Sequence, residues 1–215
     1  MSKYKTVNLL DLLDVVGEET AKQILSDFSC PKNSEIETFI RRNALDFAKR
    51  KMSITYLVFD EESSVSAMFA LTHKAIEISN EGLSSTARRK IQRYAQLDSN
   101  NNSYMVSAFL IAQFGKNDGV LALRGNELME LAFEVLENVQ RQVGGGVVYL
   151  ECEDKEPLLR FYESDANRFR VFDERYSLTD NIKYKQLVRF FLNNTKSAPD
   201  SAQKTESGAL CVRLK

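Results

Sequence analysis

The residues best suited to chemistry lie in one short stretch, VVYLECEDKEPLLRFYES, at positions 147–164. A β-branched apolar run leads into Glu151, Glu153 and Asp154, and a helical pattern containing Tyr162 follows. Carboxylates in such a place can attract a cationic amine or accept its proton, and a tyrosine can donate a proton to a leaving thiolate of similar basicity. The simpler interpretation is that the acids cap the following helix and that Tyr162 anchors it on the core. Both interpretations remain open at this point.

Other familiar catalytic chemistry has little support in the sequence. His73 is the only histidine, which leaves a single base for a Ser-His-Asp or Cys-His mechanism and disfavours a Cys/His zinc site. Cys30, Cys152 and Cys211 have no CxxC spacing, and an odd number of unpaired thiols suits a reducing compartment. We therefore expect no bound metal.

Composition sets the broad class of the protein. The chain has 215 residues, of which 43% are hydrophobic, enough for one large domain with a sizeable core. Its 29 basic and 30 acidic residues leave a net charge near −1, so no overall attraction to nucleic acid or anionic membrane is implied. No apolar run is long enough to span a bilayer and no leader peptide is visible, so we expect a cytoplasmic protein without membrane contact.

Hydrophobic periodicity predicts the elements that must position these residues. Helical spacing covers 8–28 with a break at Gly17, 33–52 with a cap at Asn33 or Ser34, 84–97, 124–142 and 156–164. Strand patterns cover 53–60, 65–79, 103–115, 146–152, 169–173 and 184–192. The first two strands are separated by turn residues and predict an antiparallel hairpin. The strand at 103–115 is almost continuously apolar, which predicts burial on both faces.

The unit from 103 to 152 is strand, helix, strand, and such a unit pairs its strands in parallel through a right-handed crossover. We therefore predict an α/β (α+β) fold with a mixed central sheet and helices on both faces. Ligands in such sheets bind beyond the carboxyl ends of parallel strands, here at the turn 115–128. The amino end of the following helix, with Gly125, Arg124 and Lys116, suits a phosphate, although the glycines could serve the turn alone.

The arrangement resembles the GNAT superfamily of acyl-CoA-dependent N-acyltransferases, of the kind found in Gram-positive bacteria and mobile elements. The resemblance covers 28–192 and is carried by SITYLVFD, AMFALTHKAIEI, SYMVSAFLIAQFGKN, RGNELMELAFEVLENV and VVYLECEDKEPLLRFYES, with Phe169 a few residues later. It implies a single GNAT-like domain at 28–192, after a helical extension at 1–27 and before a tail at 193–215. The stretch 28–51 also resembles the toxin-type members that acylate aminoacyl-tRNA.

The resemblance implies acetyl-CoA as cosubstrate, held in a V where the parallel strands 103–115 and 146–152 splay apart. The pantetheine arm would follow the strand residues Phe109, Leu110, Ile111 and Ala112, and the pyrophosphate would meet the loop residues Leu123, Arg124, Gly125 and Asn126. The amine would attack the thioester directly while Tyr162, which matches the family's tyrosine by position, protonates the departing sulfur. The family's Q/R-x-x-G-x-G/A loop is VLALRG here, and only Gly125 survives.

The acceptor amine and the base remain open in the sequence. Glu77, on a strand expected to border the acceptor groove, and Glu153 are the candidate bases, beside Glu151. The function predicted is N-acetyl transfer to a small-molecule or protein amine. The alternatives are a non-catalytic CoA-binding module and an acetyltransferase acting on aminoacyl-tRNA, to which the basic stretch ARRKIQRY at 87–94 would contribute phosphate contacts. Either a monomer or a homodimer is compatible with the sequence.

Overall fold

The computed structural model describes residues 3–120, 122–179 and 181–190. Its helices are α1 (Leu9–Val16), α2 (Glu18–Ser26), α3 (Ser34–Thr38), the π-helical turn η1 (Phe39–Asn43), α4 (Ala44–Lys49), α5 (Ser85–Ile91), α6 (Gly125–Val143) and α7 (Glu156–Glu163). Its strands are β1 (Lys5–Asn8), β2 (Ile54–Phe59), β3 (Val65–Ser79), β4 (Leu97–Asp98), β5 (Ser103–Lys116), β6 (Val147–Glu153), β7 (Arg170–Ser177) and β8 (Ile182–Phe190). The predicted tail at 193–215 lies outside the described residues.

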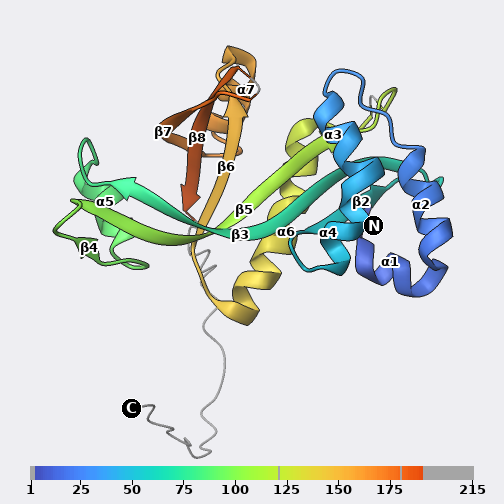
Figure 1. The fold of residues 1–215 in the computed structure, drawn as a ribbon, viewed down its shortest axis with the longest axis horizontal. Coiled ribbons are helices and arrows are strands. Elements are labelled where there is room, and N and C mark those ends of the chain that lie inside the picture. The colour runs from blue at the N-terminus through green and yellow to red at the C-terminus, as the bar shows by residue number, and fades with distance from the viewer. Residues whose placement is uncertain (1–2, 121, 180, 191–215) are drawn as a thin grey trace, which may run out of the picture.

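The strands form one mixed sheet in the order β1-β2-β3-β5-β6-β8-β7, with β4 paired to the outer part of β5 (Figure 1). The predicted hairpin is β2–β3, and β5 and β6 are parallel, joined by α6 as the crossover. All other neighbouring strands in the described sheet are antiparallel. The predicted fold class, α/β with a mixed central sheet, is confirmed. The segment before residue 28 also contributes the edge strand β1, which its helical pattern did not predict.

Helices cover both faces of the sheet because strand side chains alternate between the two faces. On one face, Phe69, Leu71, Val148 and Leu150 pack with α6 and α7. On the other face, alternate residues of β2 and β3 pack with α1 to α4. A third cluster under α5 fills the second face toward the outer ends of β3 and β5. The two faces near β5 and β6 therefore carry different helices, α6 and α7 on one and α3 on the other.

The prediction that 103–115 is buried on both faces is wrong. The outer half of β5 alternates between buried and exposed residues, with Tyr104 fully buried and Met105 60% exposed. This half extends past the helices that cover the sheet centre, and of the described helices α5 lies beside it, next to the paired strands β3 and β4 (Figure 1). An apolar strand sequence alone does not tell whether a second layer lies over each face.

Local signals place most helix ends correctly, but the helix predicted at 84–97 ends at Ile91, and Leu97 belongs to the unpredicted strand β4. Gly17, at φ 77°, separates α1 from α2, and the side chain of Asn33 accepts a hydrogen bond from the amide of Ile36 at 3.2 Å. Ser84 caps α5 in the same way, and Gly144 ends α6. These caps satisfy backbone groups that the helix itself leaves without partners, and therefore fix where α3 and α6 begin and end.

Candidate active site

The parallel strands β5 and β6 are paired at only two positions, Phe109 with Val148 and Leu110 with Tyr149. Beyond Leu110 each strand follows its other neighbour: β5 continues along β3 to Lys116, and β6 continues along β8 to Glu153. The register between β3 and β5 shifts at this point, which leaves Ala112 as an extra residue in β5. Such a bulge bends a strand and increases its twist. The bulge therefore accompanies the divergence of β5 from β6, seen in the upper part of Figure 1.

A cleft of about 290 Å³ lies between the diverging strands. From the α7 side it is lined by Tyr162 and Leu158, and from the α3 side by Asn33 and Glu35. The cleft thus connects the two faces of the sheet through the gap between β5 and β6. In this gap no residue of β6 pairs with β5 beyond Leu110 within the described chain, so backbone groups of both strands are available to an extended ligand.

Tyr162 is 9% exposed and lies on α7 with its ring edge-on to Phe161 and Phe169. Burial, with a smaller contribution from the neighbouring Cys152, raises its pKa well above the ordinary value of 10. The hydroxyl therefore keeps its proton throughout the physiological pH range. A tyrosine in this state is a proton donor rather than a base, and it borders the cleft at the end where the strands are apart.

Cys152 lies beside Tyr162 in the wall of the cleft and is a free thiol. Burial, aided by the nearby carboxylates of Asp154, Glu153 and Glu163, raises the pKa of this thiol to about 11. The nucleophilic form of cysteine is the thiolate, which is scarce at neutral pH under these conditions. Cys152 is therefore a packing residue in this wall.

The amino end of α6, the predicted phosphate site, is arranged for packing as well as for anions. Leu123 is fully buried, and a Cβ on Gly125 would lie 3.0 Å from the Phe161 ring. The side chain of Asn126 accepts a hydrogen bond from Asn167 at 3.2 Å. The backbone amide of Arg124 donates to the carboxylate of Glu127 at 2.7 Å.

The capping carboxylate of Glu127 thus occupies part of the positive end of α6, where an anion would compete with it. The first-turn amides of α6 still have no partner within their own helix. The loop therefore fits a phosphate through its backbone, but with a negative side chain already present.

Solved structures with the same arrangement were found by comparison, although no protein-family model matches the sequence and no curated protein is detectably related to it. A tyrosine-to-phenylalanine mutant of KacT has a TM-score of 0.58 and 12% identity, covering 86% of this chain and 95% of KacT. AtaT complexed with acetyl-methionyl-tRNAfMet has a TM-score of 0.57 and 13% identity, over 84% and 93% of the two chains. A mutant AtaT toxin bound to acetyl-CoA and to the C-terminus of the antitoxin AtaR has a TM-score of 0.55 and 12% identity, over 88% and 94%. The chain has the GNAT fold.

The strand residues predicted to hold the pantetheine arm divide into two pairs in this GNAT fold. Phe109 and Leu110 are paired with β6, so their facing backbone groups are already used. Ile111 and Ala112 line the cleft, and so do Gln113 and Phe114, which the sequence analysis did not include. The open edge therefore begins two residues later than predicted. No local pattern marks its start, because the bulge depends on pairing with β3.

The carboxylates predicted as bases lie in different places. Glu77 does not border the cleft: it pairs with Met105 near the outer end of β3 and accepts a hydrogen bond from Ser103 at 2.6 Å. The expectation that it lies beside the acceptor groove is wrong. β3 is long, and the cleft lies beside the part of β5 that pairs with Leu71 and the residues before it, whereas Glu77 is near the opposite end of the strand. Glu153 does line the cleft, where it forms an ion pair with Lys155.

Glu151 lines the cleft but is surrounded by hydrogen-bond donors. It accepts from Arg175 Nε at 3.2 Å, from Gln186 at 3.0 Å and from the hydroxyl of Tyr149. Burial by itself would raise the pKa of Glu151, but these bonds outweigh it and lower the pKa to about 2. A carboxylate this acidic is a poor proton acceptor. Its role is to join β6, β7 and β8 at the mouth of the cleft.

His73 lies on the opposite side of β3 from Thr72, because adjacent strand residues point to opposite faces. It lines a hollow of about 320 Å³ with Phe109 and Gly145 near the end of α6, whereas Thr72 faces the α3 side. His73 therefore lies on the α6 side of the sheet and is not among the described residues that line the cleft.

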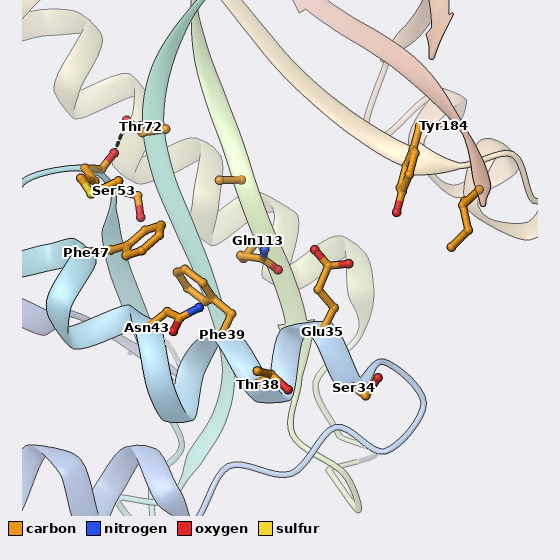
Figure 2. Close-up of a pocket in the computed structure, with 13 residues that line it drawn as sticks. Ser34, Glu35, Thr38, Phe39, Asn43, Phe47, Ser53, Thr72, Gln113 and Tyr184 are labelled. Carbon is orange, nitrogen blue, oxygen red and sulfur yellow. Dashed lines mark hydrogen bonds between the residues drawn. The ribbon is translucent and has the colours of Figure 1, made fainter. Parts of the chain in front are cut away.

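A second and larger groove, of about 610 Å³, lies on the α3 side and opens onto the cleft. Both cavities are lined by Glu35, Ala112, Gln113 and Tyr184. Figure 2 shows the carboxylate of Glu35 rising from α3 toward the space between Gln113 on β5 and Tyr184 on β8. The sequence analysis missed Glu35, since an acid in the first turn of a helix looks like an ordinary electrostatic cap. Only the docking of α3 across the end of β5 makes it a site residue.

The described residues contain neither a metal-binding cluster nor a membrane-spanning helix. Among them, no three histidine, cysteine, aspartate or glutamate side chains come together in a way that could hold a metal ion. None of the described helices combines the length and the apolar character needed to cross a bilayer.

Proposed function

We propose that the protein is an N-acetyltransferase that transfers an acetyl group from acetyl-CoA to a primary amine. The observation that carries this proposal is the divergence of β5 and β6 after Leu110, with Tyr162 beside the resulting cleft. An extended pantetheine arm can pair with the open edge of β5 at Ile111 to Gln113 as a further strand would. Similar folds in AtaT structures contain acetyl-CoA, which supports the same donor here.

The chemical step follows from the groups around the cleft. A neutral amine entering from the α3 side attacks the thioester carbonyl, the C–N bond forms, and the C–S bond breaks with its electron pair moving to sulfur. Tyr162, which stays protonated because burial raises its pKa, supplies the proton that the sulfur needs. Glu153 remains a candidate base because it lines the cleft, whereas Glu151 is too acidic and Glu77 is too distant.

The pyrophosphate of the donor would rest on the first amides of α6, through the backbone of Leu123 to Asn126. The cap formed by Glu127 makes this end less favourable for an anion than an uncapped helix end. We therefore expect acetyl-CoA to bind, but more weakly than an uncapped α6 would allow. The proposal includes a cytoplasmic location, where the free thiols of Cys30 and Cys152 stay reduced.

Calorimetric titration with acetyl-CoA and CoA, followed by a thiol-release assay over a panel of amines, tests this function. Binding together with release of CoA in the presence of an amine supports the acetyltransferase. Binding without release for any amine would instead support a non-catalytic CoA-binding module. Absence of heat with every acyl-CoA, at protein concentrations well above micromolar, would overturn both.

Transfer to aminoacyl-tRNA is the second candidate, because AtaT of similar fold is found with acetyl-methionyl-tRNAfMet. The cations expected to hold the RNA are on α5, at the far end of β3 and β5 from the cleft (Figure 1). Arg88 already donates to Asn80 at 2.8 Å, and the ammonium of Lys90 lies over the ring of Phe190. Incubation with acetyl-CoA and charged tRNA, followed by detection of acetylated aminoacyl ends, tests this candidate directly.

A further inference from the structure

The groove on the α3 side is lined by apolar side chains and by uncharged polar ones such as Thr38 and Asn43. Phe39, Phe47, Met52 and Ile182 form its apolar surfaces, and the rings of Phe39 and Phe47 meet edge to face at 5.7 Å. Phe39 lies on η1 and Phe47 on α4, and these two elements directly follow α3, which carries Glu35 (Figure 2). A groove of this size and character binds an apolar group more readily than a chain of phosphates.

Glu35 is the only charged side chain among the described residues that line this groove, and no lysine or arginine is present there. Its carboxylate has no hydrogen bond or ion pair to any other described residue. By contrast, Glu151 is held by Arg175 and Glu153 by Lys155. Glu35 is thus the carboxylate that remains available at the junction of groove and cleft.

We infer that the groove binds a primary amine carried on an apolar group, and that Glu35 binds the ammonium and takes its proton. This inference rests on the proposed function, because the cleft must supply the acetyl thioester. An isolated carboxylate attracts a cation, and the apolar walls contribute by removing apolar surface from water. The groove therefore selects an amphiphilic amine over a polyamine or an amino alcohol.

The proton balance of the step involves Glu35 and Tyr162. Two protons leave the nitrogen as the ammonium becomes an amide. The first passes from the ammonium to Glu35 and on to solvent, which frees the lone pair for attack on the thioester carbonyl. The second restores the hydroxyl of Tyr162 after that hydroxyl has protonated the departing sulfur. No oxidant, metal or further reactant is needed.

Several titratable groups face Glu35 and must be considered in any pH dependence. Those that share the cleft with it are Glu151, Cys152 and Glu153 on β6, Tyr162 on α7, Arg175 on β7 and Tyr184 on β8. On its own helix, Glu37 is paired with Arg41 at 2.7 Å. Glu151 is ionised and Cys152 and Tyr162 are protonated at neutral pH, so none of these three titrates between pH 6 and 9.

Two amines of similar basicity, phenethylamine and ethanolamine, test the inference with the full-length protein. Calorimetry without acetyl-CoA measures amine binding, and thiol release with acetyl-CoA measures turnover between pH 6 and 9. Glu35→Gln removes the charge, and Met52→Ser removes an apolar surface that is 45% exposed. Glu81→Gln, in the turn after β3, and Val15→Ser, at an 83% exposed position on α1, are the matched controls.

We expect the wild-type protein to bind phenethylamine about tenfold more tightly than ethanolamine, and Met52→Ser to reduce this preference. Glu35→Gln should lower turnover about 100-fold at neutral pH, the lower end of the range for general base catalysis. The loss should shrink as the pH approaches the pKa of the amine, because the substrate then arrives without its extra proton. A purely structural defect would not recover in this way.

The outcomes separate this inference from the proposed function. Turnover with no preference for phenethylamine, or turnover that Glu35→Gln leaves unchanged at every pH, would overturn the inference and leave the acetyltransferase standing. Glu35-dependent binding of phenethylamine without its acetylation would overturn the role of Glu35 as a base, and the wider panel of amines would then decide the acetyltransferase. Equal effects of the variants and their controls would show that the groove is not the amine site.

Discussion

The ring of Phe161 lies against the backbone of Gly125, so closely that a Cβ at residue 125 would stand 3.0 Å from Phe161 Cε2. This contact joins the first turn of α6 to α7, the helix that carries Tyr162. The glycine therefore serves close packing between elements, one of the roles of glycine at such turns. It also couples the proposed anion site to the proposed proton donor.

Gly125→Val should disturb both the first turn of α6 and the packing of α7 against it. We expect the free energy of unfolding to fall by about 1–3 kcal/mol, the usual cost of overpacking, together with lower CoA affinity and slower turnover. Chemical denaturation and calorimetry measure these changes. Adding Phe161→Leu should recover part of the lost stability, because it relieves the crowding. Wild-type stability and CoA affinity in the single variant would contradict both the contact and the anion site.

Tyr162→Phe should slow acetyl transfer while leaving acetyl-CoA affinity almost unchanged. The variant loses only the hydroxyl, and general acid catalysis contributes on the order of 10²–10⁴ to rates. Thiol release gives the rate, and calorimetry gives the affinity. Tyr176→Phe is the control, since Tyr176 is 55% exposed on β7 and does not line the cleft. A rate equal to the wild type would mean that water or another group protonates the sulfur.

Glu127→Gln should strengthen CoA binding. The carboxylate of Glu127 accepts the amide of Arg124 at 2.7 Å and places a negative charge where the diphosphate would lie. Charges near a helix end are worth about 0.3–1 kcal/mol, so a gain of about two- to fivefold in affinity is expected. Acetyl-pantetheine, which has no diphosphate, should bind both proteins alike. An equal gain for both ligands would place the diphosphate elsewhere.

Arg175→Met should destabilise the protein at neutral pH and do so less in acid. The pKa of Glu151 is lowered from 4.5 to about 2, so its stabilising contribution is complete above pH 4.5 and disappears as the pH falls to about 2. We expect a loss of about 2 kcal/mol at pH 7, as for a hydrogen bond to a charged group.

The difference in free energy of unfolding between Arg175→Met and the wild type should therefore narrow between pH 4.5 and 2. Arg160→Met, which removes a highly exposed partner of Glu156, should cost less than about 1 kcal/mol. A difference that stays constant across the acid range would show that Arg175 acts through packing rather than through the charge of Glu151.

Much of the fold could be predicted from the sequence because local sequence signals agreed with the tertiary structure. Gly17 breaks a helical pattern, Asn33 and Ser84 offer capping oxygens, and the strand–helix–strand unit around α6 has only one favoured handedness. The parallel pairing of β5 with β6 followed from these features. The short strand β1 was missed, since four residues carry too little periodicity to be distinguished from the start of a helix.

Less of the candidate site could be predicted from the sequence, because its geometry depends on how distant segments pack. The sequence by itself determined the alternating elements, the closeness of Tyr162 to the end of β6, and the acids at the end of that strand. Tertiary structure alone decided that β5 leaves β6 after Leu110, that Glu77 lies far from the gap, and that Glu35 faces it. Strand divergence and helix docking depend on contacts between residues distant in the chain, such as Ala112 against β3 and α3 across β5, and no local pattern records such contacts.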